Sequence, residues 1–394
     1  MRGKAPTVWK KARNEYILLR SGDVVTWVLA NHLSPLVVVT LIFICGVGFI
    51  FLAQHLRVLY SIYTVDSKLE LFGYLPNLSW SFSMLVLFPL IAGTIAHYYN
   101  LIPGFVENLV SGLRSDALIR EFKDKVKRRL NFPIYALSIV VLGGPLQYLY
   151  FSELREEHAW VWRQTTQNIG GGCSGILECL NALGWCAAIA QIVLAFIFVT
   201  FLFRCIAFAW CLNDLFAHPK YTKEPIPLHP DGVCGLSDLR QVIIVANFVL
   251  SLLGTYVSLY FIDKVILQRE SQFLTLTLVF GSMYLLLGPG VLLYSINAAH
   301  GRMRAAKERL LRPMGEQIRA QLEKIGTARQ RALSKNDMEG LARLRSNYAE
   351  LLKQIPEWPL DVKSARDFSQ GFALAITPAV ITLASQLLKW WLAK

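Results

Sequence analysis

The stretch PLVVVTLIFICGVGFIFL, residues 35–52, decides the fold class because it contains no charged residue. A helix of about 20 apolar residues spans the ~30 Å hydrocarbon core of a bilayer. Six further segments have the same apolar character. The sequence therefore predicts an all-α, polytopic transmembrane helical bundle, whose seven spans are residues 35–53, 80–97, 134–151, 183–210, 242–262, 273–297 and 372–391.

The composition of the whole chain agrees with a membrane location. Of its 394 residues, 54% are hydrophobic and 17% are charged, whereas soluble domains carry about 25% charged residues. The net charge of +13 would also suit a protein that binds nucleic acid. In a membrane protein, however, Lys and Arg gather in cytoplasmic loops and attract anionic lipid headgroups. We therefore expect the lipid bilayer, rather than nucleic acid, as the partner of these charges.

Basic residues alternate along the segments that separate the spans. The rich segments hold 31 Lys and Arg and the poor segments hold eight, while Arg204 lies inside the fourth span. This pattern predicts a cytoplasmic amino terminus and an outside carboxyl terminus. We expect Arg204 to reach the lipid headgroups by snorkelling. No small-residue cleavage site follows the first span, so we expect that span to be retained.

Four regions follow from this layout: a basic amphipathic segment (1–33), a six-span region (34–297), a basic cytoplasmic helical hairpin (298–361) and the seventh span (372–391). The hairpin is predicted by apolar residues at three- and four-residue spacing, on both sides of a turn in which Asp337 caps the second helix. Residues 116–130 fit an amphipathic helix at the inner membrane interface. The hairpin's apolar residues are Leu311, Met314, Ile318, Leu322, Ile325, Leu341, Leu344, Tyr348, Leu351 and Ile355.

Sequence motifs of catalysis and cofactor binding are missing. The chain has no P-loop, no dinucleotide glycine fingerprint, no His-Glu-x-x-His helix and no Gly-x-Ser-x-Gly turn. The seven cysteines do not follow the spacing of a zinc site. We therefore expect no enzyme activity, no cofactor and no metal. Cys173 and Cys179 share a loop that we place outside, and whether they form a disulfide depends on the redox state of that compartment.

Two spans carry polar residues at helical spacing: Asn247, Ser251 and Thr255 in the fifth, and Thr382, Ser385 and Gln386 in the seventh. Polar groups inside a membrane avoid lipid and face protein or water. Two interpretations stay open, namely helix packing through hydroxyl hydrogen bonds or the lining of a pore that several subunits build. The seventh span is the stronger pore candidate because Gln386 is large and polar.

Two further segments have a structural and a functional interpretation. Residues 225–236 read PIPLHPDGVCGL. They form either a rigid turn that launches the fifth span, or a ligand or gating loop in which His229, Asp231 and Gly232 make the contacts. Within the sixth span, Gly288, Pro289 and Gly290 form either a fixed kink or a hinge that couples the hairpin to the membrane helices.

Residues 227–236, together with IPEWPLD at 355–361, resemble a group of uncharacterised bacterial polytopic inner-membrane proteins. These proteins share a Pro-x-His-Pro-Asp-x-x-Gly-Gly-Leu type of loop and a Trp-Pro-hydrophobic-Asp motif before a final helix. The present chain departs from them at Cys234, where they more often carry glycine. The resemblance implies a multi-pass protein of a bacterial inner membrane and assigns no activity to any residue.

The predicted layout is also similar in architecture to insect odorant and gustatory receptors, which are tetrameric ligand-gated cation channels lined by their seventh helix. Small oligomeric channels also occur among membrane effectors of bacterial stress and anti-phage systems. These likenesses imply a homo-oligomeric channel or pore-forming effector, gated from the cytoplasm by a small-molecule ligand or a soluble partner. The alternatives are a non-conducting sensor or scaffold that recruits a soluble partner through the hairpin, and a lipid-directed enzyme with His229 and Asp231 as acid and base.

Overall fold

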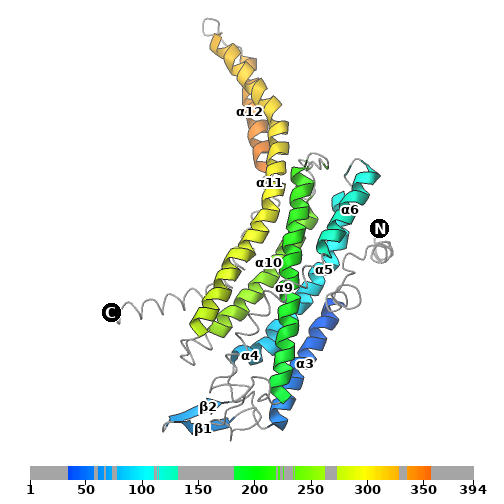
Figure 1. Cartoon of the computed structure of the whole chain (residues 1–394). Coiled ribbons are helices and arrows are strands. Elements are labelled where there is room, and N and C mark those ends of the chain that lie inside the picture. Colours follow the sequence, from blue (N-terminus) through cyan, green and yellow to red (C-terminus); the bar gives the residue numbers. More distant parts are fainter. Residues whose placement is uncertain are drawn as a thin grey trace, which may run out of the picture.

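A bundle of long helices, from which one pair of helices projects, forms the protein (Figure 1). The structure is a computed structural model. The third and seventh predicted spans and the basic segment 1–33 lie outside the residues that it describes, which are 34–56, 61–65, 68–72, 78–110, 113, 115–131, 182–218, 221, 225, 234, 236–261, 273–327 and 335–355.

Four helices within the described residues are long and apolar enough to cross a membrane. They are Pro35–His55, Trp80–Val110, Ala182–Ala217 and Asp238–Tyr256. They correspond to the first, second, fourth and fifth predicted spans, and they make the chain a multi-pass membrane protein. The sixth predicted span forms the first turns of a much longer helix, α11 (Phe273–Thr327).

The first span, α3 (Pro35–His55), begins where its local sequence signals place it. The hydroxyl of Ser34 accepts a hydrogen bond from the backbone N–H of Val37 at 3.3 Å. Pro35 occupies the first helical position, where a missing N–H has no cost. Serine followed by proline therefore fixes the start of the helix.

The second span is longer than predicted and contains a π-helical turn. It runs through α4 (Leu78–Phe82), the π-helix η1 (Ser83–Leu87) and α5 (Phe88–Val110). The prediction ended this span at residue 97, where polar residues begin. The helix continues because a protein surface covers its last turns, so that Tyr98, Ile102 and Phe105 are buried.

Helix α3 packs closely on this second span through two glycines. A Cβ atom on Gly46 would lie 2.7 Å from the backbone oxygen of Met84 in η1. A Cβ atom on Gly93 of α5 would overlap the side chain of Val39. The two helices can approach this closely only because both positions lack a side chain.

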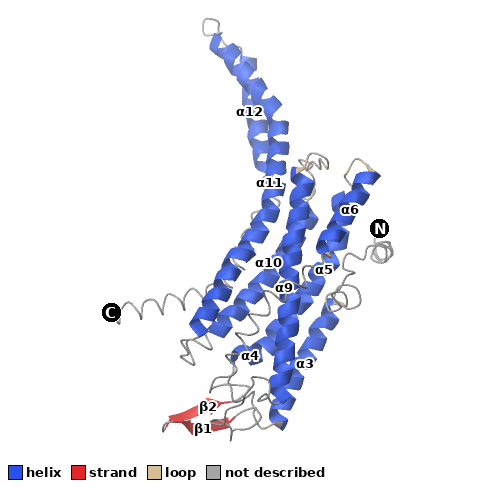
Figure 2. Ribbon diagram, viewed as in Figure 1, coloured by secondary structure: helices blue, strands red, loops and turns tan. Residues whose placement is uncertain are grey.

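The described residues are mainly helical, which agrees with the predicted all-α class, and one short antiparallel β-hairpin that was not predicted lies between α3 and α4. Strands β1 (Ser61–Val65) and β2 (Lys68–Phe72) pair with Ser61 opposite Phe72 and Val65 opposite Lys68. The two strands are separated by only two residues, and β1 is rich in β-branched and aromatic side chains, a pattern that favours a hairpin. Figure 2 shows this hairpin at the end of the bundle opposite α12.

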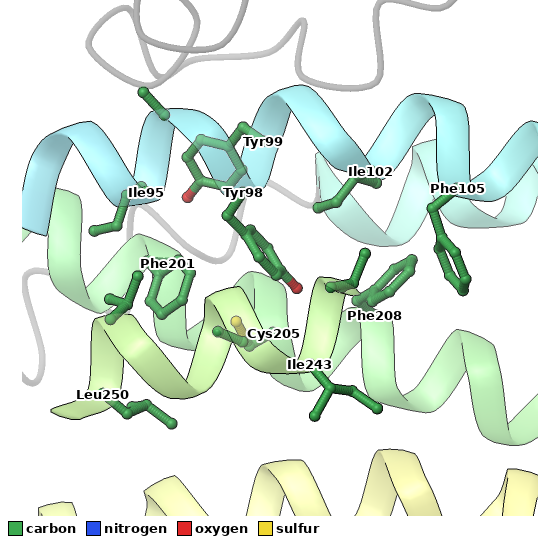
Figure 3. Packing of buried hydrophobic residues seen from close by; sticks show 14 of the residues in the cluster. Ile95, Tyr98, Tyr99, Ile102, Phe105, Phe201, Cys205, Phe208, Ile243 and Leu250 are labelled. Carbon is green, nitrogen blue, oxygen red and sulfur yellow. The ribbon is translucent and has the colours of Figure 1, made fainter. Parts of the chain in front are cut away.

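Helices α5, α9 (Ala182–Ala217) and α10 (Ser237–Phe261) share a core of aromatic and aliphatic side chains. Tyr98 of α5 and Phe201 of α9 meet edge to face, with their ring centroids 5.2 Å apart. Farther along the same two helices, Phe105 and Phe208 repeat this contact at 5.6 Å. Figure 3 shows these rings between the helices, with Ile243 of α10 beside them.

The predicted amphipathic helix 116–130 is observed as α6 (Asp116–Leu130). Its apolar residues Phe122, Val126 and Leu130 are buried against the rest of the chain, and α6 packs on α9. The expectation that α6 lies at the lipid interface is therefore wrong for its apolar face. A neighbouring protein helix, rather than lipid, covers that face.

Helix α11 is 55 residues long, which corresponds to about 80 Å at the rise of an α-helix. Its first part packs against α9 and α10, and its last part packs against α12 (Lys335–Gln354). We refer to residues 298–327 of α11 together with α12 as the projecting hairpin, since the pair extends beyond the other helices (Figure 1). Helix α12 begins two residues before Asp337, so this residue lies in the first turn and is not the cap.

Candidate functional site

Most of the functional residues that the sequence suggested lie outside the described part of the chain. This holds for the pore candidates of the seventh span, for the gating candidates of the loop at 225–236, and for the two cysteines of the outside loop. These residues are Thr382, Ser385, Gln386, His229, Asp231, Gly232, Cys173 and Cys179. Their roles stay predictions.

The polar residues of the fifth span lie on α10, which packs against α5 and α11. Asn247 is buried, and Ser251 and Thr255 are half-buried. The hydroxyl of Thr255 donates a hydrogen bond to the backbone oxygen of Ser251 at 3.0 Å, within the same helix. This arrangement suits helix packing, because these side chains are partnered or covered by one chain alone.

The proposed hinge residues lie inside α11, and the helix continues without a break through Gly288, Pro289 and Gly290. Gly290 is exposed, and a Cβ atom built on it would meet no other atom within 4 Å. The structure places these residues in the part of α11 that precedes the projecting hairpin. A hinge at this position would tilt the hairpin relative to the other helices.

Arg204 is a charged side chain buried inside the bundle, with only 3% of its surface exposed. Its Nε donates a hydrogen bond to the backbone oxygen of Leu130 at 3.2 Å. Its guanidinium carbon lies 5.4 Å from the ring centroid of Tyr99, a cation–π distance. The snorkelling prediction is therefore wrong. Leu130 is the last residue of α6, and its carbonyl offers the guanidinium a partner inside the protein.

A second cation binds the end of α9. The Nε of Arg302, on α11, donates a hydrogen bond to the backbone oxygen of Phe216. Nη2 of the same side chain donates to the backbone oxygen of Ala217 at 3.3 Å. Phe216 and Ala217 are the last two residues of α9. The planar guanidinium thus links α11 to the terminus of a membrane-spanning helix.

A third cation binds the end of α12. Lys307 lies five residues after Arg302 on α11 and has only 7% of its surface exposed. Its Nζ donates a hydrogen bond to the backbone oxygen of Leu352, in the last turn of α12, at 2.8 Å. Five residues correspond to about 140° around a helix. Arg302 and Lys307 therefore leave α11 on different sides, one toward α9 and the other toward α12.

These three side chains share one chemistry, and we refer to Arg204, Arg302 and Lys307 as the capping cations. The last four carbonyls of an α-helix have no partner within the helix. They carry the negative end of the helix dipole, which a cation stabilises. Each capping cation comes from a neighbouring helix, so that α6 is joined to α9, α9 to α11, and α11 to α12.

An ionic cluster between α6 and α9 reinforces the first of these connections. Lys125 and Arg129 of α6 both lie 2.8 Å from the same carboxylate oxygen of Asp214 on α9. The hydroxyl of Tyr221 lies 3.4 Å from a carboxylate oxygen of Glu121. Glu121, in the first half of α6, therefore lies near Tyr221 just beyond the end of α9, whereas the last residue of α6, Leu130, pairs with Arg204 farther back in α9. This register means that the two helices run antiparallel.

Sequence reasoning found Arg204 but assigned it to the lipid, and it did not single out Arg302 or Lys307. The available signal was weak. One arginine in an apolar span marks an unusual position, but it does not identify the carbonyl that the arginine binds. Arg302 and Lys307 are two basic residues among many in the same segment. Nothing in the sequence separates them from their exposed neighbours.

The left-handed backbone at Cys234 is a further local feature. Its φ angle is 57°, and it is the one positive-φ residue other than glycine in the described part of the chain. Glycine adopts this conformation readily, whereas other residues are strained in it. A glycine at this position would adopt the same angle without this strain.

Comparison of the chain with protein-family models, with curated protein sequences and with solved structures finds no match.

Proposed function

We propose that this chain is the subunit of a homo-oligomeric channel or pore-forming effector of a bacterial inner membrane, gated from the cytoplasmic side through the projecting hairpin. The observation that carries the proposal is α11, one unbroken helix that enters both the membrane bundle and the hairpin. A partner or ligand that moves the hairpin would move the membrane part of α11 with it.

The capping cations support this mechanical connection. Arg302 fixes α11 to the end of α9, and Lys307 fixes α12 to α11 less than two helical turns farther along. The base of the hairpin is therefore attached to a membrane-spanning helix on one side and to the returning helix on the other. A displacement of α12 reaches α9 through one short stretch of α11.

The pore of the proposed channel is assigned to the seventh span. The burial of Asn247 within one chain favours a packing role for the fifth span. Thr382, Ser385 and Gln386 then remain the candidates for the lining, with one copy from each subunit. Bacterial stress or anti-phage defence, in which a trigger opens such a pore, is the setting that we propose for the activity.

Ion flux through liposomes tests this proposal. The full chain is purified, its subunit number is measured, and it is reconstituted with an enclosed potassium-sensitive dye. We expect a discrete oligomer that conducts ions, and we expect Gln386→Leu to lower the flux while the oligomer is retained. Unchanged flux in Gln386→Leu would remove the seventh span from the pore, and a monomer or dimer that never conducts would overturn the channel.

A non-conducting scaffold is the second candidate, and the exposed, ion-paired surface of the hairpin favours it. Three arginines of α11 pair there with glutamates four residues later, at 2.9–3.1 Å. Deleting residues 314–354 separates the two functions. A scaffold loses its partner and its whole activity on deletion, whereas a channel loses its response to the trigger but keeps a conducting membrane part.

A further inference from the structure

The two helices of the projecting hairpin leave their shared apolar stripe partly open. At the base of the hairpin, Leu311 and Ile355 are buried. Toward the turn, Leu322 and Met338 are 51% and 49% exposed. Burial thus falls along the stripe, and between these ends lie six half-buried residues: Met314, Ile318, Leu341, Leu344, Tyr348 and Leu351.

Helix geometry explains why the stripe stays open. An amphipathic helix carries an apolar stripe that is at least about 100° wide, and one neighbouring helix covers only part of it. In bundles of three or four helices, further neighbours cover the rest. Among the described residues, α12 packs mainly against α11. The hairpin therefore has room for at least one more helix along its stripe.

The charge of the hairpin restricts what this helix can be. Residues 298–355 contain 13 Lys and Arg but only six Asp and Glu. In the described part of α11 beyond residue 298, each acidic residue already forms an ion pair with the arginine four residues before it. These acidic residues are Glu308, Glu316 and Glu323. The hairpin as a whole keeps an excess of seven basic residues over acidic ones, so a partner of complementary charge is acidic.

We infer that the open stripe of the hairpin docks an acidic amphipathic helix of a soluble protein. Apolar side chains of this helix, repeated every three or four residues, would cover Leu322 and Met338. Its carboxylates would lie beside exposed basic side chains that flank the stripe, such as Arg345, which directly follows Leu344 on α12. The inference rests on the proposed function in one respect, because it takes the hairpin as the element that receives the signal.

Three other occupants fit the hairpin less well. A second hairpin would bring the same basic excess to the interface, and like charges repel. The bilayer is remote, because α11 continues for about 40 Å beyond the buried Ala299. A nucleic acid would pair with the arginines but would leave the exposed leucine and methionine uncovered.

A peptide of defined composition tests the inference. The probe is a synthetic 21-residue helix with leucine at the first and fourth positions of each heptad and glutamate at most others. Two control peptides replace either all glutamates by lysine or all leucines by serine. Binding is measured by fluorescence anisotropy on the full chain in lipid nanodiscs. We expect the acidic peptide alone to bind, and its affinity to fall as salt is raised.

Matched variants locate the site. Leu322 and Met338 are exposed, so the double substitution Leu322→Ser with Met338→Ser should leave the fold intact. We expect this double variant to bind the acidic peptide about tenfold more weakly. Arg343→Glu with Arg345→Glu should weaken it at least as much. The control is Arg120→Glu with Lys127→Glu on α6, which removes the same amount of charge from exposed positions away from the hairpin and should leave the affinity unchanged.

Several results would overturn the inference: equal binding of the lysine peptide, unchanged affinity in both hairpin variants, or tighter binding of an RNA or DNA oligonucleotide that the same variants abolish. Efficient crosslinking between hairpins of neighbouring subunits through Met338→Cys would assign the stripe to a second copy. Ion flux is measured separately, on the same purified proteins reconstituted in liposomes. Peptide binding without any ion flux would contradict the channel and support the docking surface. Ion flux without peptide binding would contradict the docking surface and support the channel.

Discussion

Arg302 of α11 donates a hydrogen bond to the backbone oxygen of Phe216, at the end of α9. This contact joins residues 86 positions apart. It satisfies a carbonyl that has no partner within its own helix. Because α11 also carries α12, the contact attaches the projecting hairpin to a membrane-spanning helix.

Removal of this guanidinium should loosen the base of the hairpin. We expect Arg302→Gln to lower the free energy of unfolding by about 1–2 kcal/mol, since a charge-assisted hydrogen bond to a helix end is lost. Arg302→Lys should recover part of this loss, because lysine keeps the charge but cannot reach both carbonyls with a planar fork. Thermal unfolding in detergent measures both values, with Arg312→Gln on the exposed surface as the control. Equal stability of the two glutamine variants would contradict the capping role.

Arg204 should hold α6 in place. We expect Arg204→Met to speed hydrogen exchange of the backbone amides of residues 116–131 about tenfold, because α6 loses the partner of Leu130. Methionine fills a similar volume without the charge, so exchange in α3 should stay unchanged. Mass spectrometry of exchanged peptides resolves the two regions. Equal exchange of α6 in both proteins would mean that packing alone holds this helix.

The close approach of α3 to the second span can be tested with two neighbouring glycines. Gly46→Ala places a Cβ atom 2.7 Å from the backbone oxygen of Met84, whereas Gly48→Ala meets no atom within 4 Å. We expect Gly46→Ala to destabilise the fold by about 1–3 kcal/mol. Gly48→Ala should be neutral or slightly stabilising, since alanine favours a helix. Thermal unfolding distinguishes them, and equal effects would refute the close packing.

The left-handed backbone at Cys234 predicts an unusual order of stabilities. At most positions alanine is at least as stabilising as glycine. At a φ of 57°, the free energy of unfolding of the glycine variant should exceed that of the alanine variant by about 1–2 kcal/mol, because a Cβ atom is disfavoured there. The pair Cys234→Gly and Cys234→Ala tests this order by chemical unfolding. Both substitutions remove the thiol, so their difference reports the backbone. Greater stability of the alanine variant would show an ordinary conformation.

The hinge hypothesis predicts a separation of stability from activity. Gly290→Ala should keep or raise the stability of α11, because the position is open and alanine favours a helix. If bending at Gly288–Gly290 transmits the signal, the same substitution should lower the triggered ion flux. Gly315→Ala, which is equally open but lies within the hairpin, serves as the control. Wild-type flux in Gly290→Ala would leave these residues as a fixed part of the helix.

Local signals explain which parts of the fold were predictable. The start of α3 follows from Ser34 and Pro35, and the limits of α6 match the predicted stretch 116–130. The β-hairpin between α3 and α4 was missed although its signal is also local, because a search for apolar runs does not detect alternation of side chains over five residues.

The amino-acid sequence by itself determined that the chain enters a membrane and that most of it is helical, because long apolar runs and three-to-four-residue spacing are properties of each segment alone. It did not determine what three of its cations bind. Arg204, Arg302 and Lys307 each bind a carbonyl of another helix, between 45 and 86 residues away. Only the tertiary structure decided these partners. Every residue has the same backbone carbonyl, and such a carbonyl binds a cation only when the fold brings a helix end beside a basic side chain of another helix.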